Sequence, residues 1–206
     1  MKKYLVFVMI MLAAAIGCSK SKTTEPPVTV PTAAEDVASG WANFNAAAYS
    51  SAQSYFASAL GKDAALADAY NGKGWCQGIL GNPSAALSTF KDGLSLSGAN
   101  NEIKAGLAFS YAALDSSSQA VTKGLEVLLA DSLWQFSHTY RPSVRDNVLN
   151  YKEVALLLAQ SYFKLGQFSN ALLWAKKLNP GFSADIATIA GQAALQVEIE
   201  RLAGTM

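Results

Sequence analysis

Apolar and small residues recur along this chain at spacings of three and four positions, the pattern of one face of an α-helix. In the segment from Ser50 to Leu60, that face consists of Ala52, Tyr55, Phe56, Ala59 and Leu60. Polar residues fill the positions between them, and Gly61 follows as a stop signal. The pattern predicts short amphipathic helices joined by tight turns.

The same pattern returns at a fixed offset along the chain. The aligned segments are 33–66, 67–100 and 101–134. They place Trp41, Trp75 and Phe109 in one position, and we call these three residues the aromatic column. The constant spacing between them, which we call the repeat offset, indicates one supersecondary unit used several times.

The second segment shows the unit most clearly. Its pattern predicts helices over 68–80 and 84–96, joined by a turn at Gly81, Asn82 and Pro83. The unit resembles a tetratricopeptide repeat, and the residues that carry the resemblance are Gly74, Gly81, Ala86, Phe90 and Leu94. The resemblance implies an all-α fold, a right-handed α-solenoid of helical hairpins in which the first helix of each hairpin lines the concave side.

The period breaks after the third segment. An insert of mainly polar and turn-forming residues occupies 135–151, and the repeat pattern resumes over 152–180. A last apolar periodicity predicts a helix over 183–202. We interpret this helix as the C-terminal cap, since a solenoid needs a terminal unit with a polar outer face.

The N-terminal segment predicts where in the cell the protein is located. Lys2 and Lys3 precede an apolar run that is too short for a comfortable membrane span, and Gly17 and Cys18 close it. The segment resembles the signal peptide of bacterial lipoproteins, which implies removal of 1–17 and acylation of Cys18. An ordinary secretory signal that ends near a cysteine is the alternative. Residues 18–32, rich in Pro, Thr and Ser, predict a lipidated, extended tether.

The tetratricopeptide resemblance places the aromatic column on the concave side. Trp41, Trp75 and Phe109 would then form a ladder into which an extended peptide or a helix docks, with Asn71, Gln160 and Lys164 as polar neighbours. The alternative is that these rings pack against neighbouring helices or the cap. Their exposure distinguishes the two interpretations.

The insert is a second candidate site. Tyr140, Arg141 and Arg145 combine an aromatic ring with two guanidinium groups, a composition common at interfaces. The alternative interpretation, which we favour from the sequence, is a connector that bridges an imperfect repeat. His138, the one histidine of the chain, is predicted to be a surface or turn residue.

Composition and charge exclude several classes of function. The net charge is +1, and −1 without Lys2 and Lys3, so nothing suggests a nucleic-acid partner. The sequence contains no metal-ligand spacing, nucleophile motif or phosphate-binding loop, and we expect neither a cofactor nor an enzymatic activity. Cys76 is predicted to be a small buried apolar residue in a helix.

These patterns favour a non-catalytic adaptor or scaffold for a protein or peptide partner, held in the bacterial cell envelope by a lipid on Cys18. Ser19 after the cysteine favours the outer membrane, facing the periplasm or the cell surface, over the inner membrane. The alternative is a structural subunit of an oligomeric envelope complex, which predicts an exposed apolar patch on the convex side or at the cap.

Overall fold

The computed structural model describes residues 30–97, 101–140 and 148–205. The chain divides into two units, Met1–Val30 and Pro31–Met206, and the fold described below belongs to the second unit. Cys18 and the signal-like segment lie outside the described residues.

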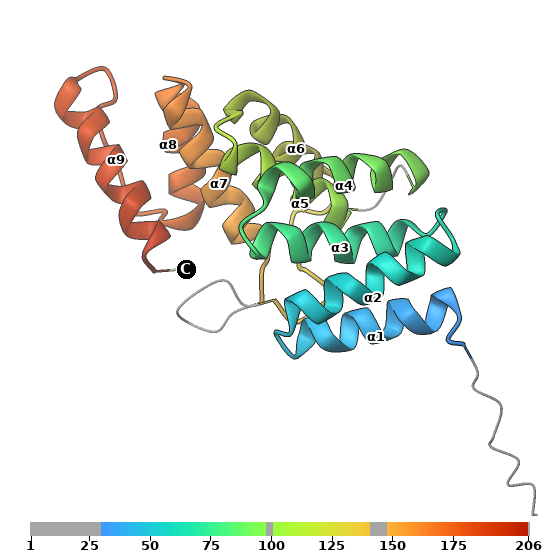
Figure 1. The fold of residues 1–206 in the computed structure, drawn as a ribbon. Coiled ribbons are helices and arrows are strands. Elements are labelled where there is room, and N and C mark those ends of the chain that lie inside the picture. Colours follow the sequence, from blue (N-terminus) through green and yellow to red (C-terminus); the bar gives the residue numbers. More distant parts are fainter. Residues whose placement is uncertain (1–29, 98–100, 141–147, 206) are drawn as a thin grey trace, which may run out of the picture. The chain divides into compact units, whose positions relative to one another are not determined.

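Nine α-helices lie within the described ranges (Figure 1). They are α1 (Ala33–Asn45), α2 (Tyr49–Lys62), α3 (Ala67–Ile79), α4 (Pro83–Ser97), α5 (Asn101–Ala113), α6 (Ser117–Ala130), α7 (Tyr151–Lys164), α8 (Phe168–Leu178) and α9 (Ile189–Ala203). Consecutive helices pack as four hairpins, and α9 packs against α7 and α8. The first helices α1, α3, α5 and α7 also contact one another in order, so they form one continuous layer. This is the all-α solenoid predicted from the sequence.

The turn inside each hairpin uses one residue in the left-handed region of backbone conformation. These residues are Ala47 (φ 59°), Gly81 (φ 83°), Asp115 (φ 53°) and Gly166 (φ 70°). The first three occupy the same position in successive repeats. Glycine adopts this conformation without steric cost, so the glycines at 81 and 166 are the locally favoured choice.

In the first two hairpins, glycines of the first helices make room for a phenylalanine from the second helix. A Cβ atom on Gly40 would approach the Phe56 ring to 2.6 Å, and a Cβ atom on Gly74 would approach the Phe90 ring to 2.5 Å. Gly72 and Gly106 meet the same two rings from the next hairpin along the solenoid. Each buried ring is therefore enclosed by two glycines, so close helix packing explains the glycines of α3 at 72 and 74.

Two predicted boundaries differ from the structure. The last helix begins at Ile189 rather than at Ser183, because Thr188 caps it by accepting a hydrogen bond from the backbone N–H of Gly191. The fourth hairpin begins at Tyr151, where Asn150 and Glu153 form a capping box. Among the described helices, none combines the length and the apolar character that crossing a bilayer requires.

Candidate functional site

The described part of the insert lies across the layer of first helices. We call residues 134–140 the strap. Its Phe136, His138 and Tyr140 alternate with Ser137 and Thr139, and its backbone bends at Ser137 and His138. All three rings contact aromatic residues of the first hairpin or of α3. The strap is therefore seated on the aromatic column.

The first position of the column is covered by His138. The imidazole stacks on the Trp41 indole with a centroid distance of 3.3 Å and an interplanar angle of 8°. Trp41 is 8% exposed, and its Nε1–H donates to Asp68 Oδ2 at 3.0 Å. His138 lies in a bend, as predicted for a turn residue, but this contact leaves it half-buried rather than open on the surface.

The second position is covered by Phe136 and Tyr140. The Phe136 ring lies edge-on to Trp75 at 4.9 Å between centroids, and the Tyr140 ring lies 6.1 Å from the same indole. Trp75 is 5% exposed. The expectation that Trp41 and Trp75 form an open ladder is therefore wrong, because the chain's own strap packs over both rings.

Polar groups hold the strap in place from both sides. Glu102 Oε1 accepts a hydrogen bond from the backbone N–H of Ser137 at 2.7 Å, and Glu102 Oε2 accepts one from Asn71 Nδ2 at 2.6 Å. The backbone N–H of Thr139 donates to Asn45 Oδ1 at 2.8 Å. Asn71, expected beside the docking surface, is 1% exposed and instead orients the carboxylate that holds the strap.

Burial and hydrogen bonding act on the pKa of Glu102 in opposite directions. Burial favours the neutral acid and raises the pKa, while hydrogen bonds from His138, Ser137 and Asn71 favour the carboxylate and lower it. The hydrogen bonds have the larger combined effect, so the pKa of Glu102 lies below its usual value. Glu102 is consequently an anion at neutral pH, in the form that accepts all of these bonds.

The end of the insert pairs with the strap. The backbone N–H of Phe136 donates to the carbonyl of Leu149 at 2.9 Å, and the N–H of Tyr151 donates to the carbonyl of Trp134 at 2.7 Å. Gln135 and Asn150 form an antiparallel bridge. This pairing satisfies backbone groups of the strap and brings Leu149 beside the column.

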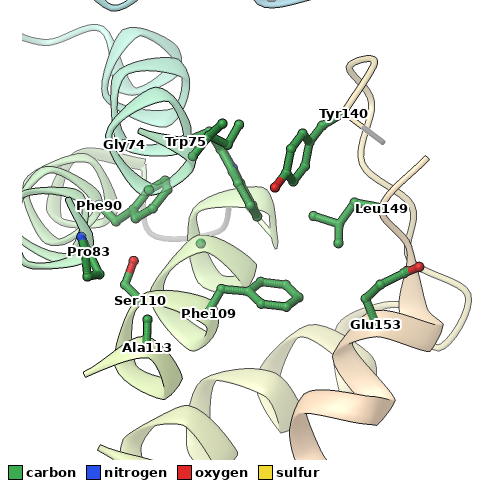
Figure 2. Close-up of a pocket in the computed structure, with 13 residues that line it drawn as sticks. Gly74, Trp75, Pro83, Phe90, Phe109, Ser110, Ala113, Tyr140, Leu149 and Glu153 are labelled. Carbon is green, nitrogen blue, oxygen red and sulfur yellow. The ribbon is translucent and has the colours of Figure 1, made fainter. Parts of the chain in front are cut away.

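The third position of the column, Phe109, is not covered in the same way. Its half-buried ring lies 6.1 Å from the Trp75 ring and borders an apolar pocket of about 310 Å³ (Figure 2). The pocket is lined by Gly74, Trp75, Gly78, Ile79, Pro83, Phe90, Gly106, Phe109, Ser110, Ala113, Tyr140, Leu149 and Glu153. Glu153 is the one charged residue among them, and its Oε2 already accepts a hydrogen bond from the backbone N–H of Asn150.

The two remaining polar candidates lie elsewhere. Gln160 and Lys164 line a separate cleft between the end of α5, α7 and α9, together with Gln196 and Glu200. Lys164 Nζ lies 2.6 Å from Asp115 Oδ1 in an exposed ion pair. The structure therefore does not bring Gln160 or Lys164 together with the aromatic column.

The insert residues singled out from the sequence have different outcomes. Tyr140 belongs to the strap and lines the pocket, whereas Arg141 and Arg145 lie outside the described residues. Phe136 and Leu149, each 2% exposed, were missed although they anchor the insert. The alternation of Phe136, His138 and Tyr140 is the signal that could have identified the strap as an extended segment with one ring-bearing face.

Within the described residues, no group of three or more His, Cys, Asp or Glu side chains is arranged to hold a metal ion. Cys76 is fully buried, and burial raises the pKa of its thiol to about 12. The predicted apolar role of Cys76 is confirmed, and its thiol is unsuited to nucleophilic chemistry.

Comparisons with known proteins support the fold. No protein-family model matches the sequence, and no curated protein matches it significantly. Among solved structures, the chain is similar to a tetratricopeptide repeat protein from Parabacteroides merdae ATCC 43184, with a TM-score of 0.56 and 16% identity, covering 84% of this chain and 60% of that one. It is also similar to a mutant of MamA, with a TM-score of 0.59 and 16% identity, covering 84% of this chain and 88% of that one.

These similarities define the class of fold, a solenoid of the tetratricopeptide-repeat type. The chain spans about 60% of the length of the Parabacteroides merdae chain.

Proposed function

We propose that this protein is a non-catalytic scaffold that binds a protein partner through the layer of first helices. The pocket beside Phe109 carries the proposal, because it is an apolar recess at the one position of the aromatic column that the strap does not cover. Anchors at protein interfaces are typically large apolar or aromatic side chains that fill such recesses. Partner binding in other solenoids of this fold class is consistent with the proposal and is an analogy from fold.

Membrane attachment is the second part of the proposal. The lipoprotein-like segment that ends at Cys18 would place an acyl anchor at the start of the mature chain, in the bacterial cell envelope and preferably at the outer membrane. The tether before α1 would keep the solenoid at a distance from the lipid surface. The protein would then act by holding its partner near that membrane.

Site-specific photo-cross-linking tests the partner-binding part. A photoreactive phenylalanine analogue replaces Phe109 in the full chain in native membranes, and the same analogue replaces Tyr55, which is 40% exposed, as the control. We expect a protein adduct of defined mass at position 109 that is missing at position 55. Identical adduct patterns at both positions would refute binding at the column.

Metabolic labelling with a fatty-acid analogue tests the anchor. We expect Cys18→Ser to abolish labelling and to move the protein out of the membrane fraction, while Cys76→Ser keeps both properties. Labelling that survives Cys18→Ser would contradict lipidation at this residue.

An exposed apolar surface favours a second candidate function, that of a structural subunit in an oligomer. Leu129, Leu133 and Leu173 are 85%, 70% and 55% exposed, and Leu129 borders a cleft that also includes Trp174 and Leu178. Exposed apolar patches mark interaction sites when they are contiguous. Light scattering over a range of concentrations tests this candidate: the mass should rise with concentration, and Leu129→Ser should reduce the rise.

A further inference from the structure

The strap shows what the aromatic column accepts. At the first position a ring stacks on Trp41, and at the second position a ring packs edge-on against Trp75. Both occupying rings come from one short segment that bends at Ser137 and His138, and the backbone N–H groups of Ser137 and Thr139 donate to side chains of the solenoid. Each filled position therefore holds an aromatic side chain from a segment whose backbone is also hydrogen-bonded to the solenoid.

Phe109 is the equivalent residue at the third position, since it follows Trp75 at the repeat offset. Here the occupying ring is missing from the described part of the strap, and the pocket of about 310 Å³ lies beside the Phe109 ring (Figure 2). Tyr140 and Leu149 close one side of this pocket, so the strap that fills two positions also helps to build the third.

The lining determines the chemistry of the occupant. The volume lies at the lower end of the range for ligand sites, and it suits one large side chain rather than a cofactor. The lining residues include no cation, and the nearest charge is the carboxylate of Glu153. An anionic group would therefore be desolvated without a compensating partner, and a neutral group fits better.

We propose that the pocket binds one uncharged aromatic side chain of the partner, which would fill the third position of the column as the rings of the strap fill the first two. This inference rests on the proposed scaffold function and specifies the residue type that the site recognises. Edge-to-face contact with Phe109 and Trp75 would favour an aromatic over an aliphatic side chain.

Gly78 offers a matched pair of variants that changes the pocket without changing the core. It lies exposed in the last turn of α3, and a Cβ atom there would meet its nearest neighbour, Ala86 Cβ, at 3.9 Å. In Gly78→Leu a branched side chain would occupy the pocket, whereas in Gly78→Ala a single methyl group would leave most of it open. Both variants should fold, and circular dichroism and thermal unfolding verify this.

The probes are N-acetyl-L-phenylalaninamide, N-acetyl-L-leucinamide and the carboxylate N-acetyl-L-phenylalanine. Each is titrated into the full chain carrying Cys18→Ser, so that no acyl group competes, and the amide signals of Ser110 and Ala113 are followed by NMR. We expect saturable shifts with the phenylalanine amide, binding about two- to tenfold weaker for the leucine amide, and weaker binding still for the carboxylate. Gly78→Ala should behave like the parent, and Gly78→Leu should weaken binding at least about tenfold.

Several outcomes would overturn the inference. They are the absence of saturable shifts, binding that survives Gly78→Leu, equal affinity for the leucine and phenylalanine amides, and preference for the carboxylate. The cross-link at position 109 distinguishes a failure of the scaffold function from a failure of this inference. A protein adduct without aromatic selectivity leaves the scaffold function standing and removes this inference, whereas selective probe binding without any protein adduct overturns the partner on which both depend.

Discussion

The aromatic column has a covered part and an open part, although its residues are equivalent in the repeat. Trp41 and Trp75 lie beneath the strap and are nearly inaccessible, while Phe109 remains half-buried at the edge of a pocket. The repeat places the three rings, but a segment outside the repeat determines which of them a partner could reach. Binding sites in such a solenoid therefore depend on its irregular parts as much as on its periodic ones.

The same contrast appears in the polar groups. Asp68 and Glu102 also occupy equivalent positions of the repeat, yet Asp68 accepts the Trp41 indole N–H while Glu102 accepts bonds from Ser137 and Asn71. The Trp75 indole N–H has no hydrogen-bond partner in the described part of the chain. Where the strap docks, Glu102 therefore holds the insert, and the Trp75 indole N–H is left without an acceptor among the described residues.

The largest expected effect comes from removing the central anchor of the covered part. Phe136 is 2% exposed and contacts Trp41, Phe44 and Trp75. Truncation in Phe136→Ala should lower the free energy of unfolding by about 3–5 kcal/mol, since it leaves a cavity among buried rings. Urea unfolding followed by tryptophan fluorescence measures the change.

Phe109→Ala is the matched variant in the open part, because its ring borders an existing pocket. The loss should be only about 2 kcal/mol, below the range for a fully buried phenylalanine. Equal losses of unfolding free energy for Phe136→Ala and Phe109→Ala would show that the buried ring of the strap stabilises the fold no more than the half-buried ring at the pocket does.

Replacing the Glu102 carboxylate, which holds the strap, should have the next largest effect on stability. Removing its charge in Glu102→Gln should cost about 1–3 kcal/mol at pH 7, because hydrogen bonds to an ionised acceptor are replaced by weaker ones. The pKa of Glu102 is lowered in the folded protein, so its stabilisation is present above the pKa of the unfolded chain. That stabilisation is lost as the pH falls through the lower pKa of the folded state.

Urea unfolding at a series of pH values tests the sign. The difference in stability between wild type and Glu102→Gln should shrink below about pH 4.5. Other acids with lowered pKa values, such as Asp36 and Glu198, remain in both proteins and cancel in the comparison. A difference that stays the same far below that pH would mean that Glu102 does not hold the strap as an anion.

The helical hairpins could be predicted from the sequence because their signals are local. Spacings of three and four positions and the repeat offset identify the helices, and Gly81 marks one turn. Asp115 and the serines after it mark the third turn, since aspartate tolerates the left-handed region. Ala47 occupies the equivalent position without any turn-forming side chain, so only the repeat register places that turn.

The covering of the column could not be predicted in this way. The contact between Thr139 and Asn45 joins residues 94 positions apart, and neither has a pattern that specifies the other. Alternation in the strap predicts an extended segment with one aromatic face, but it does not say which surface that face meets. The pocket was missed for the same reason, since Tyr140 and Leu149 reach it only after the strap has docked.

A smaller difference in stability is expected between phenylalanine variants of the two tryptophans. Trp41→Phe removes the hydrogen bond from the indole to Asp68, whereas Trp75→Phe removes a donor that has no described partner. Both variants lose similar ring volume, and the indole hydrogen bond is a main difference between the two sites. We expect Trp41→Phe to be more destabilising than Trp75→Phe by about 1 kcal/mol, measured by urea unfolding. A larger loss for Trp75→Phe would indicate that its N–H is satisfied.

The smallest effect concerns two glycines one turn apart on the same face of α3, of which Gly74 packs against a buried ring and Gly78 lies open. A methyl group in Gly74→Ala would collide with the buried Phe90 ring, whereas in Gly78→Ala it would enter the pocket without a close contact. Gly78→Ala should therefore raise the free energy of unfolding by about 0.4–1 kcal/mol, because alanine reduces the conformational freedom of the unfolded chain. Gly74→Ala should instead lower it, since overpacking forces the ring or the helix to move. Thermal unfolding of the two variants side by side measures both signs, and a destabilising Gly78→Ala would mean that the space beside Phe109 is already filled.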